Sequence, residues 1–492
     1  MNEQQSFRPK ARLPRGFRDR DEAELAAEMR MLDTICRVYS SYGFQALETS
    51  SLEYADALGK FLPDQDRPNE GVFSFKDDDG QWLSLRYDLT APLARYVAEN
   101  FQNLPKPFRR YQVGTVWRNE KPGPGRFREF TQFDADTVGS ASPAADAELL
   151  MMFADTLEAL GLKRGEYVIK VNSRKLLDGV LEAAGVDSSQ RGTVLRAIDK
   201  LDRLGREGVR ALLGPGRKDE SGDFTKGAGL NSDQIARIIA FVAPETVVDE
   251  NERLASISNL LVGSRIGAAG TDELKQIAAI LASSGYGPDR MHFDTGIVRG
   301  LDYYTGAVYE AQLTFPVTND AGEAVVFGSV GGGGRYDDLI ARFTGQSVPA
   351  SGISIGVSRL LSALRAREGA EVWETEPLVV VLVLDKGAIA ESFKLAAELR
   401  AAGIRAEAYV GEAGMKAQLK YADRRNAAIA VIEGGDERAR GEVMLKDLAL
   451  GAELAKSTEN RAAWVKDRPA QHAVQRGQLV PAIRAMLGAR RG

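Results

Sequence analysis

Two runs with β-strand character, separated by a short loop of Gly and Pro, constrain this chain more than any other feature. The first run is Arg110–Arg118, the second is Phe127–Ala135, and the loop is Lys121–Gly125. Strand-forming residues on both sides of such a loop are typical of an antiparallel hairpin. Further strand-like runs lie at Val72–Lys76, Trp82–Tyr87, Met291–Val298, Tyr303–Thr314, Ala324–Val330 and Gly352–Val357.

Helical patterns lie between these strand-like runs. Apolar spacing and stop signals predict helices at Asp21–Tyr42, Ala144–Leu160, Tyr336–Phe343 and Ser358–Ala366. From about Leu176 to Gly285 the sequence is rich in Ala, Leu and Ile with charged residues between them. This stretch predicts a mostly helical insertion.

The C-terminal part has a different pattern. After a charged linker, Arg367–Glu376, strand-like and helix-like segments alternate as β-α-β-α-β, which predicts a parallel or mixed α/β module. From Pro377 onward there are 19 Lys+Arg against 14 Asp+Glu, while the whole chain has 64 against 69. A basic module on an acidic body suggests contact with a polyanion, and an ordinary solvated surface would look the same.

Composition excludes several classes of protein. Apolar residues make up 44% of the chain, which is ordinary globular usage, and no apolar run approaches the ~20 residues of a membrane helix. The first residues lack the apolar core of a secretory signal. One cysteine and two histidines exclude a disulfide framework and make Cys/His zinc sites implausible. These features predict a cytoplasmic protein.

Arginines gather at the predicted hairpin. Arg118 ends the first strand, and Arg126 and Arg128 begin the second, so pairing of the strands would bring them toward one turn. Guanidinium groups bind oxyanions with two hydrogen bonds, and Glu120 nearby suits a metal that accompanies phosphate. The alternative is a solvated hairpin with ordinary salt bridges.

Three later segments also carry candidate site residues. Arg299 precedes two adjacent tyrosines, Tyr303 and Tyr304, which would point to opposite faces of a strand, one into the core and one into a pocket. The run Gly331–Gly334 would let backbone approach a ligand, or would be a hinge. Arg359 in the first turn of a helix can reach a phosphate. No GxxxxGK[ST] loop is present, which disfavours a P-loop nucleotidase.

Together these segments resemble the histidyl-tRNA synthetases, a family of class II aminoacyl-tRNA synthetases. LRYDLTAPLARY, the arginine hairpin, RGLDYYTGAVYE, GGGGRYDDLI and GISIGVSRL lie in the family's order and at similar spacing. The resemblance covers nearly the whole chain. It implies an α+β catalytic core, an antiparallel sheet flanked by helices, in residues 1–175 and 286–370. A helical insertion would occupy 176–285, and an α/β anticodon-binding domain 377–492.

The resemblance also implies a reaction and its partners. A homodimer would join L-histidine and ATP, with Mg²⁺, into histidyl-adenylate and pyrophosphate, then transfer histidine to the 3′ end of tRNA-His. The implied catalytic arginines are Arg118 and Arg299. The implied ATP contacts are Arg118, Glu120, Arg126, Phe130 and Arg359, with Glu120 assisting Mg²⁺. Asp88 and Thr90 would hold the α-amino group of histidine and Gln132 its carboxylate, while Asp136 and Tyr304 would read the imidazole in a pocket that includes Tyr303 and Tyr336.

The sequence departs from the family pattern at several positions. Ser50 stands where a proline is usual at the dimer interface, Ser358 replaces an acidic residue, and Asp136 replaces a longer Glu. Two other readings remain open on the sequence. One is the synthetase-like regulatory subunit of ATP phosphoribosyltransferase, which lacks the terminal module and the arginines. The other is a class II synthetase for a different amino acid, which RGLDYY disfavours.

The hairpin loop predicts how the enzyme treats the 5′ end of its tRNA. Family members that read an extra guanosine there use polar side chains of this loop, whereas Gly123 and Pro124 offer none. We therefore expect the enzyme to accept a histidine tRNA without that guanosine. Charging two transcripts that differ only in this nucleotide tests the prediction. A preference above about 10²-fold for the extra guanosine would equal a strong base contact and contradict it.

Overall fold

The computed structural model describes residues 9–61, 71–122, 127–218, 222–243, 257–297, 300, 304–318, 324–368, 376–448, 450 and 470–489. The chain divides into two compact units, residues 1–373 and 374–492.

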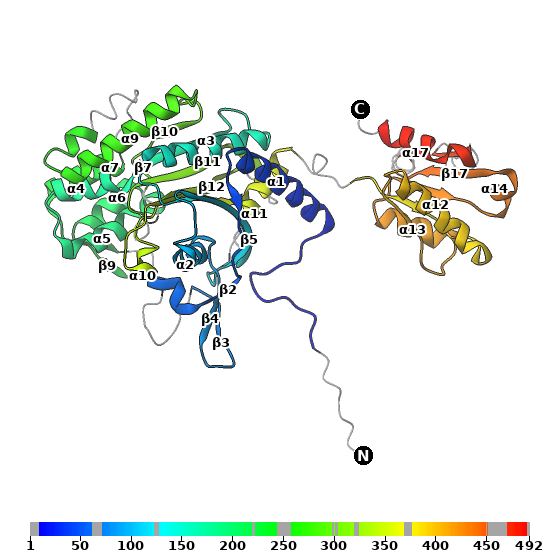
Figure 1. The fold of residues 1–492 in the computed structure, drawn as a ribbon, viewed down its shortest axis with the longest axis horizontal. Coiled ribbons are helices and arrows are strands. Elements are labelled where there is room, and N and C mark those ends of the chain that lie inside the picture. The colour runs from blue at the N-terminus through cyan, green and yellow to red at the C-terminus, as the bar shows by residue number, and fades with distance from the viewer. Residues whose placement is uncertain are drawn as a thin grey trace, which may run out of the picture. The chain divides into compact units, whose positions relative to one another are not determined.

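An eight-stranded sheet forms the centre of the first unit (Figure 1). Its strand order is β1 (Gln45–Ala46), β5 (Phe108–Trp117), β6 (Glu129–Val138), β13 (Ala350–Gly356), β12 (Ala324–Arg335), β11 (Ala307–Thr318), β7 (Tyr167–Ser173) and β10 (Met291–Phe293). All pairs from β5 to β7 are antiparallel, and only the edge strands β1 and β10 pair in parallel. The expected hairpin is therefore confirmed as β5 and β6, in the middle of a larger sheet.

The apolar face of this sheet carries the main core. Alternate residues of the central strands, among them Phe133 on β6 and Ile355 on β13, are fully buried. They pack against the helices α1 (Glu22–Ser41), α3 (Pro143–Ala159) and α11 (Val357–Glu368). In Figure 1, α2 (Thr90–Asn100) lies on the opposite side of the sheet. Because side chains alternate along a strand, burying one face leaves the other face free to form a site.

Two expectations are wrong, one for the glycine-rich segment and one for the segment that follows it. The run Gly331–Gly334 does not follow a strand but lies inside β12, paired on both sides with β11 and β13. The glycines are needed there for packing, because a Cβ on Gly333 would lie 2.0 Å from the carbonyl oxygen of Gly352. The helix expected at Tyr336–Phe343 is reduced to the single turn of α10, Ala341–Thr344.

Helices dominate the chain between β7 and β10. They are α4 (Arg174–Ala183), α5 (Ser188–Ile198), α6 (Leu201–Leu213), α7 (Ser232–Val242) and α9 (Arg265–Ser283), with a short hairpin of β8 (Gly216–Lys218) and β9 (Phe224–Lys226). Helices α4 and α9 approach very closely, since a Cβ on Gly179 would lie 2.6 Å from the Cα of Gly267. The ion pair between Lys175 and Glu273 links the same two helices.

A small antiparallel sheet precedes α2. It consists of β2 (Leu52–Tyr54), β4 (Trp82–Leu85) and β3 (Ser74–Lys76), with the 3-10 helix η1 (Ala55–Phe61) after β2. Glu53 of β2 forms an ion pair of 2.9 Å with Arg95 of α2, which ties this sheet to the helix.

The second unit is a five-stranded mixed sheet with helices. Its strand order is β15 (Ala406–Ala408), β14 (Val379–Val381), β16 (Ile429–Ile432), β17 (Glu442–Asp447) and β18 (Gln471–Gln475). Its helices are η3 (Lys386–Ala388), α12 (Ile389–Ala401), α13 (Met415–Arg424), α14 (Gly435–Arg440), η4 (Arg476–Gln478) and α17 (Leu479–Gly488). The first three strands pair in parallel and the last three antiparallel. In the part of both units that the structure describes, no helix is long and apolar enough to cross a membrane.

Candidate active site

The second face of the central sheet is polar. On β6, the alternate residues Gln132, Asp134 and Asp136 are all buried. The β-sheet register places Gly114, Gln112 and Arg110 of β5 beside them on one side, and Gly356, Ser354 and Gly352 of β13 on the other. Small residues of β13 lie beside the polar and charged residues of β6, so this face has both space and polar groups.

A cavity of about 610 Å³ lies over this face. It is lined by residues between β4 and the start of α2, by the hairpin β5–β6, by the glycines of β12 and by the start of α11. Of the residues expected in the site, the cavity brings together Asp88, Thr90, Arg118, Glu120, Phe130, Gln132, Tyr304 and Arg359. These positions span more than 270 residues of sequence, so the fold assembles them at one place.

Two arginines make part of the cavity wall basic. The Nε of Arg118 donates to the carbonyl oxygen of Tyr87 at 3.2 Å, and its guanidinium lies 5.2 Å from the ring centroid of Phe130. The Nη2 of Arg359 donates to the carbonyl oxygen of Phe327 at 2.5 Å. A backbone carbonyl thus holds each of the two guanidinium groups.

The carboxylate of Asp88 makes another part of the wall acidic. Its Oδ1 accepts hydrogen bonds from the backbone N–H groups of Thr90 at 3.2 Å and Ala91 at 2.9 Å, at the start of α2. Burial raises the pKa of Asp88, and these two hydrogen bonds together with the charge of Arg118 lower it in part. The cavity therefore contains groups of both signs.

Asp136 and Tyr336, expected to read the imidazole, lie below the cavity and are not among its lining residues. Both are 2% exposed, and the Tyr336 hydroxyl donates to Asp136. The Nη2 of the fully buried Arg110 lies 2.8 Å from Asp136 Oδ2 and donates to the Leu89 carbonyl. Gly352 is required here, because a Cβ would lie 2.0 Å from Asp136 Oδ1.

Three expected site residues lie outside the described part of the chain. These are Arg126, Arg299 and Tyr303. Gly300, which follows Arg299, and Tyr304, which follows Tyr303, both line the cavity.

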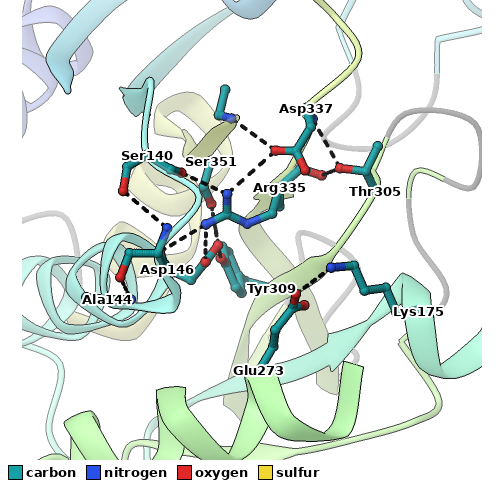
Figure 2. Close-up of polar contacts among 12 residues, drawn as sticks. Ser140, Ala144, Asp146, Lys175, Glu273, Thr305, Tyr309, Arg335, Asp337 and Ser351 are labelled. Atoms are coloured by element: carbon teal, nitrogen blue, oxygen red, sulfur yellow. Dashed lines mark hydrogen bonds and ion pairs between the residues drawn. The ribbon is translucent and has the colours of Figure 1, made fainter. Parts of the chain in front are cut away.

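A buried network holds the segment after Tyr304 (Figure 2). The Arg335 guanidinium forms an ion pair with Asp146 of α3, whose carboxylate also accepts from Ser351 Oγ at 2.8 Å and from the Tyr309 hydroxyl. The backbone N–H of Thr305 donates to the Arg335 carbonyl at 2.7 Å. Arg335, part of the GGGGRYDDLI motif, thus fixes the backbone next to Tyr304 and does not line the cavity.

Sequence reasoning missed two polar residues of the cavity floor, Asp134 and Ser354, and the charged Arg110 buried beneath them. A usable signal existed, because Asp134 lies midway between Gln132 and Asp136, and positions i, i+2 and i+4 of a strand share one face.

A larger cleft of about 1460 Å³ adjoins the first. Arg118, Glu120 and Gly300 line both. The rest of the cleft wall comes from α5, α6 and β9 and includes the basic residues Arg196, Lys200 and Lys226. The helical segment therefore faces the same space as Arg118 of the hairpin.

An antiparallel sheet flanked by helices, with arginines around a cavity on its polar face, defines a class II aminoacyl-tRNA synthetase. Residues 16–360 match the family model described as Histidyl-tRNA synthetase, and residues 378–468 match the one described as Anticodon binding domain. The chain belongs to the histidyl-tRNA synthetase family. Its activity is that of an ATP-dependent histidine–tRNA ligase.

Similar proteins support this assignment along the whole chain. The histidine–tRNA ligase of Brucella abortus is 57% identical over 98% of this chain and 96% of its own length. That of Caulobacter vibrioides is 56% identical over 98% of both. The crystal structure of histidyl-tRNA synthetase from Nostoc sp. has a TM-score of 0.72 and 30% identity, and the match covers 97% of this chain and 100% of that one.

Proposed function

We propose that the cavity binds histidine and ATP side by side and that histidyl-adenylate forms there. The supporting observation is that one cavity holds Asp88 and Asp134 together with Arg118 and Arg359. An amino acid presents a cationic ammonium group, and a nucleotide presents anionic phosphates. Histidine-dependent exchange of pyrophosphate into ATP tests this proposal, and no exchange by the purified folded protein would contradict it.

In the proposed reaction, the carboxylate of histidine attacks the α-phosphorus of ATP. A C–O–P bond forms, the bond to the bridging oxygen breaks, and pyrophosphate leaves. Negative charge grows on the non-bridging oxygens, so fixed guanidinium groups stabilise the transition state. We assign this role to Arg118 and, on the family resemblance, to Arg299. The carboxylate needs positioning more than a base.

ATP would lie along the basic wall. Phe130 provides a ring face for the adenine, Arg359 lies within the same cavity, and Arg126 would reach the outer phosphates. Mg²⁺ would arrive with the nucleotide, since this ion is usually held by one or two carboxylates and the phosphates. Glu120, exposed at the junction of the two cavities, fits as such a carboxylate. Among the described residues no cluster of three acidic, His or Cys side chains forms a metal site of its own.

The imidazole would lie at that end of the cavity where Tyr304 forms part of the wall. Asp136 is held below by Arg110 and Tyr336, which fixes the position of its carboxylate. A ring with a nitrogen on each side needs polar groups at both ends. We therefore keep Tyr304 and Asp136 as the residues that select histidine, with Tyr303 and Tyr336 beside them.

The tRNA would contact both units. The wide cleft leads to Arg118 and carries basic side chains, so it suits the 3′ end of tRNA-His. We propose that residues 176–285 form an insertion between the core segments 1–175 and 286–370, and that 377–492 bind the anticodon stem.

We also propose a cytoplasmic homodimer. The family resemblance places Ser50 at the dimer interface, at a position that is usually proline. Its hydroxyl accepts a hydrogen bond from the backbone N–H of Leu52 at 3.1 Å.

Removing the second unit is expected to separate the two half-reactions. A chain ending at Glu376 keeps every described cavity residue, so histidine-dependent pyrophosphate exchange should stay at the full-length rate. Charging of tRNA should fall, and the remaining tRNA affinity should depend less steeply on salt, because phosphate contacts are lost. Filter binding at several salt concentrations measures this. Unchanged charging by the shortened chain would assign the second unit another task.

A further inference from the structure

Asp134, a buried carboxylate on the cavity floor, contributes acidic charge to the cavity, and its contact with the substrate is not assigned above. Asp134 is 2% exposed and lines the cavity, and its Oδ1 has no hydrogen-bond partner in the described part of the chain. The neighbouring carboxylates are engaged: Asp88 accepts backbone hydrogen bonds at α2, and Asp136 contacts Arg110 and Tyr336. A buried polar atom usually has a partner, so Asp134 Oδ1 has a bonding position open to a ligand.

A second open acceptor lies two residues earlier on the same strand face. The Nε2 of Gln132 donates to Ser354 Oγ at 2.8 Å, and its Oε1 has no partner among the described residues. Ser354 also makes a side-chain hydrogen bond with Asp134. One hydroxyl therefore holds both side chains. Gln132 Oε1 can only accept a hydrogen bond, and Asp134 Oδ1 accepts one when the carboxylate is ionised.

These two acceptors fit a cation with several N–H groups. An ammonium has three donors and no acceptor, whereas a carboxylate or phosphate would find no donor on either atom. We propose that Asp134 and Gln132 together bind the α-ammonium group of the substrate histidine, with Asp134 supplying the charge. This inference rests on the proposed binding of histidine in this cavity. It reassigns Gln132, expected from the resemblance to hold the carboxylate, because one amide N–H is used by Ser354 and the atom of this side chain without a partner among the described residues is its acceptor oxygen.

The electrostatic surroundings of Asp134 agree with a role in binding a cation. Burial, with a further contribution from the charge of Asp136, raises the pKa of Asp134 to about 7, although Arg110 and Ser354 lower it. The other groups that interact with its charge are Asp88, Arg86, Tyr336 and, from α1, Tyr39. Near neutral pH the empty site is therefore partly protonated. A bound ammonium favours the ionised form, so histidine binding should release part of a proton from this residue.

The first test compares Asp134→Asn with the wild-type enzyme. The substitution keeps the shape and removes the charge, so the dissociation constant for histidine should rise roughly 10- to 100-fold, the effect of one charged hydrogen bond. The dissociation constant for ATP should not change. Asp155→Asn is a matched control, because Asp155 lies on α3 and bonds to Tyr42 and Tyr286, away from the cavity.

Two substrate analogues locate the contact. L-Histidinol keeps the ammonium and lacks the carboxylate, and 3-(imidazol-4-yl)propionate keeps the carboxylate and lacks the ammonium. Asp134→Asn should weaken inhibition by histidinol as much as it weakens histidine binding, and should leave inhibition by the propionate unchanged. An equal loss with both analogues would place Asp134 at the imidazole and overturn the proposal. Normal histidine binding by a folded Asp134→Asn variant would overturn it as well.

Proton release gives a readout that a merely structural role would not produce. Calorimetry of histidine binding at pH 7, in buffers of different ionisation enthalpy, should show more proton release by the wild type than by Asp134→Asn. Equal release would contradict the proposal. A wild-type enzyme that bound no histidine would instead refute the proposed function, so the two failures are distinguishable.

The folding of the variant can be checked independently. A carboxyl with a raised pKa destabilises the folded state fully above its folded pKa and not at all below its unfolded pKa of about 4. Asp134→Asn should therefore melt at or above the wild-type temperature at pH 8, with a smaller difference at pH 5. If this variant fails to fold, Ser354→Ala is the alternative, because it releases both Gln132 and Asp134. It should weaken inhibition by histidinol and leave inhibition by the propionate unchanged. An equal loss of inhibition by both analogues would then overturn the proposal.

Discussion

Replacing Arg118 with Ala is expected to slow histidine-dependent pyrophosphate exchange by about 10²- to 10³-fold, the cost of losing one preorganised group at a developing negative charge. The Arg118 guanidinium is held by the Tyr87 carbonyl and lies beside Phe130 in the cavity. In the proposed site this fixed guanidinium acts on charge that develops at the α-phosphate, so its contribution should appear mainly in the transition state. The rate constant should therefore fall much more than the affinity for ATP, which single-turnover exchange and ATP titration measure separately.

Two further variants make this result specific. Arg118→Lys keeps the charge and loses the two-pronged geometry, so its rate should lie between the wild type and the Ala variant. Arg109→Ala removes an arginine from the same strand, β5, but on the other face, where it pairs with Glu148. Exchange by Arg109→Ala should match the wild type. Near-normal exchange by a folded Arg118→Ala variant would exclude Arg118 from the reaction.

The sheet could be predicted where side-chain pattern and turn chemistry agree. The runs around Tyr111 and Phe133 alternate apolar and polar residues, which is the period of a half-buried strand. The Gly331–Gly334 run could not be placed, because glycine carries no such pattern and fits a loop, a hinge or a strand equally well. Its place inside β12 depends on the close approach of Gly352 and Phe153, which only the folded sheet creates.

The site was predictable as a set of residues but not as a geometry. Family motifs pointed to Arg118, Phe130 and Arg359, and the structure places them around one cavity. The same motifs say nothing of Asp134, because its function depends on which neighbouring carboxylates are already bonded. That information lies in contacts between strands, such as Arg110 with Asp136, and not in the order of residues along the chain.

Selection of histidine should be the largest single effect in this enzyme. We expect wild-type exchange to discriminate against L-β-(2-thienyl)alanine, whose five-membered ring lacks both nitrogens, by about 10⁴ in kcat/KM. The reason is that a bound ring without nitrogens leaves the buried polar groups around Tyr304 and Asp136 without partners. Competition between the two amino acids in the exchange assay measures the ratio.

The two selecting residues differ in how cleanly they can be tested. Asp136→Asn also removes the charged partner of the buried Arg110, so any loss would mix binding with stability. Tyr304→Phe removes only a hydroxyl beside the cavity and should lower the discrimination by roughly 10- to 100-fold, the cost of leaving a polar group unpaired. Tyr167→Phe removes the same group from a buried tyrosine of β7 that bonds to Glu158 outside the cavity, and should keep the wild-type ratio. Equal ratios for both tyrosine variants would show that the imidazole is read elsewhere.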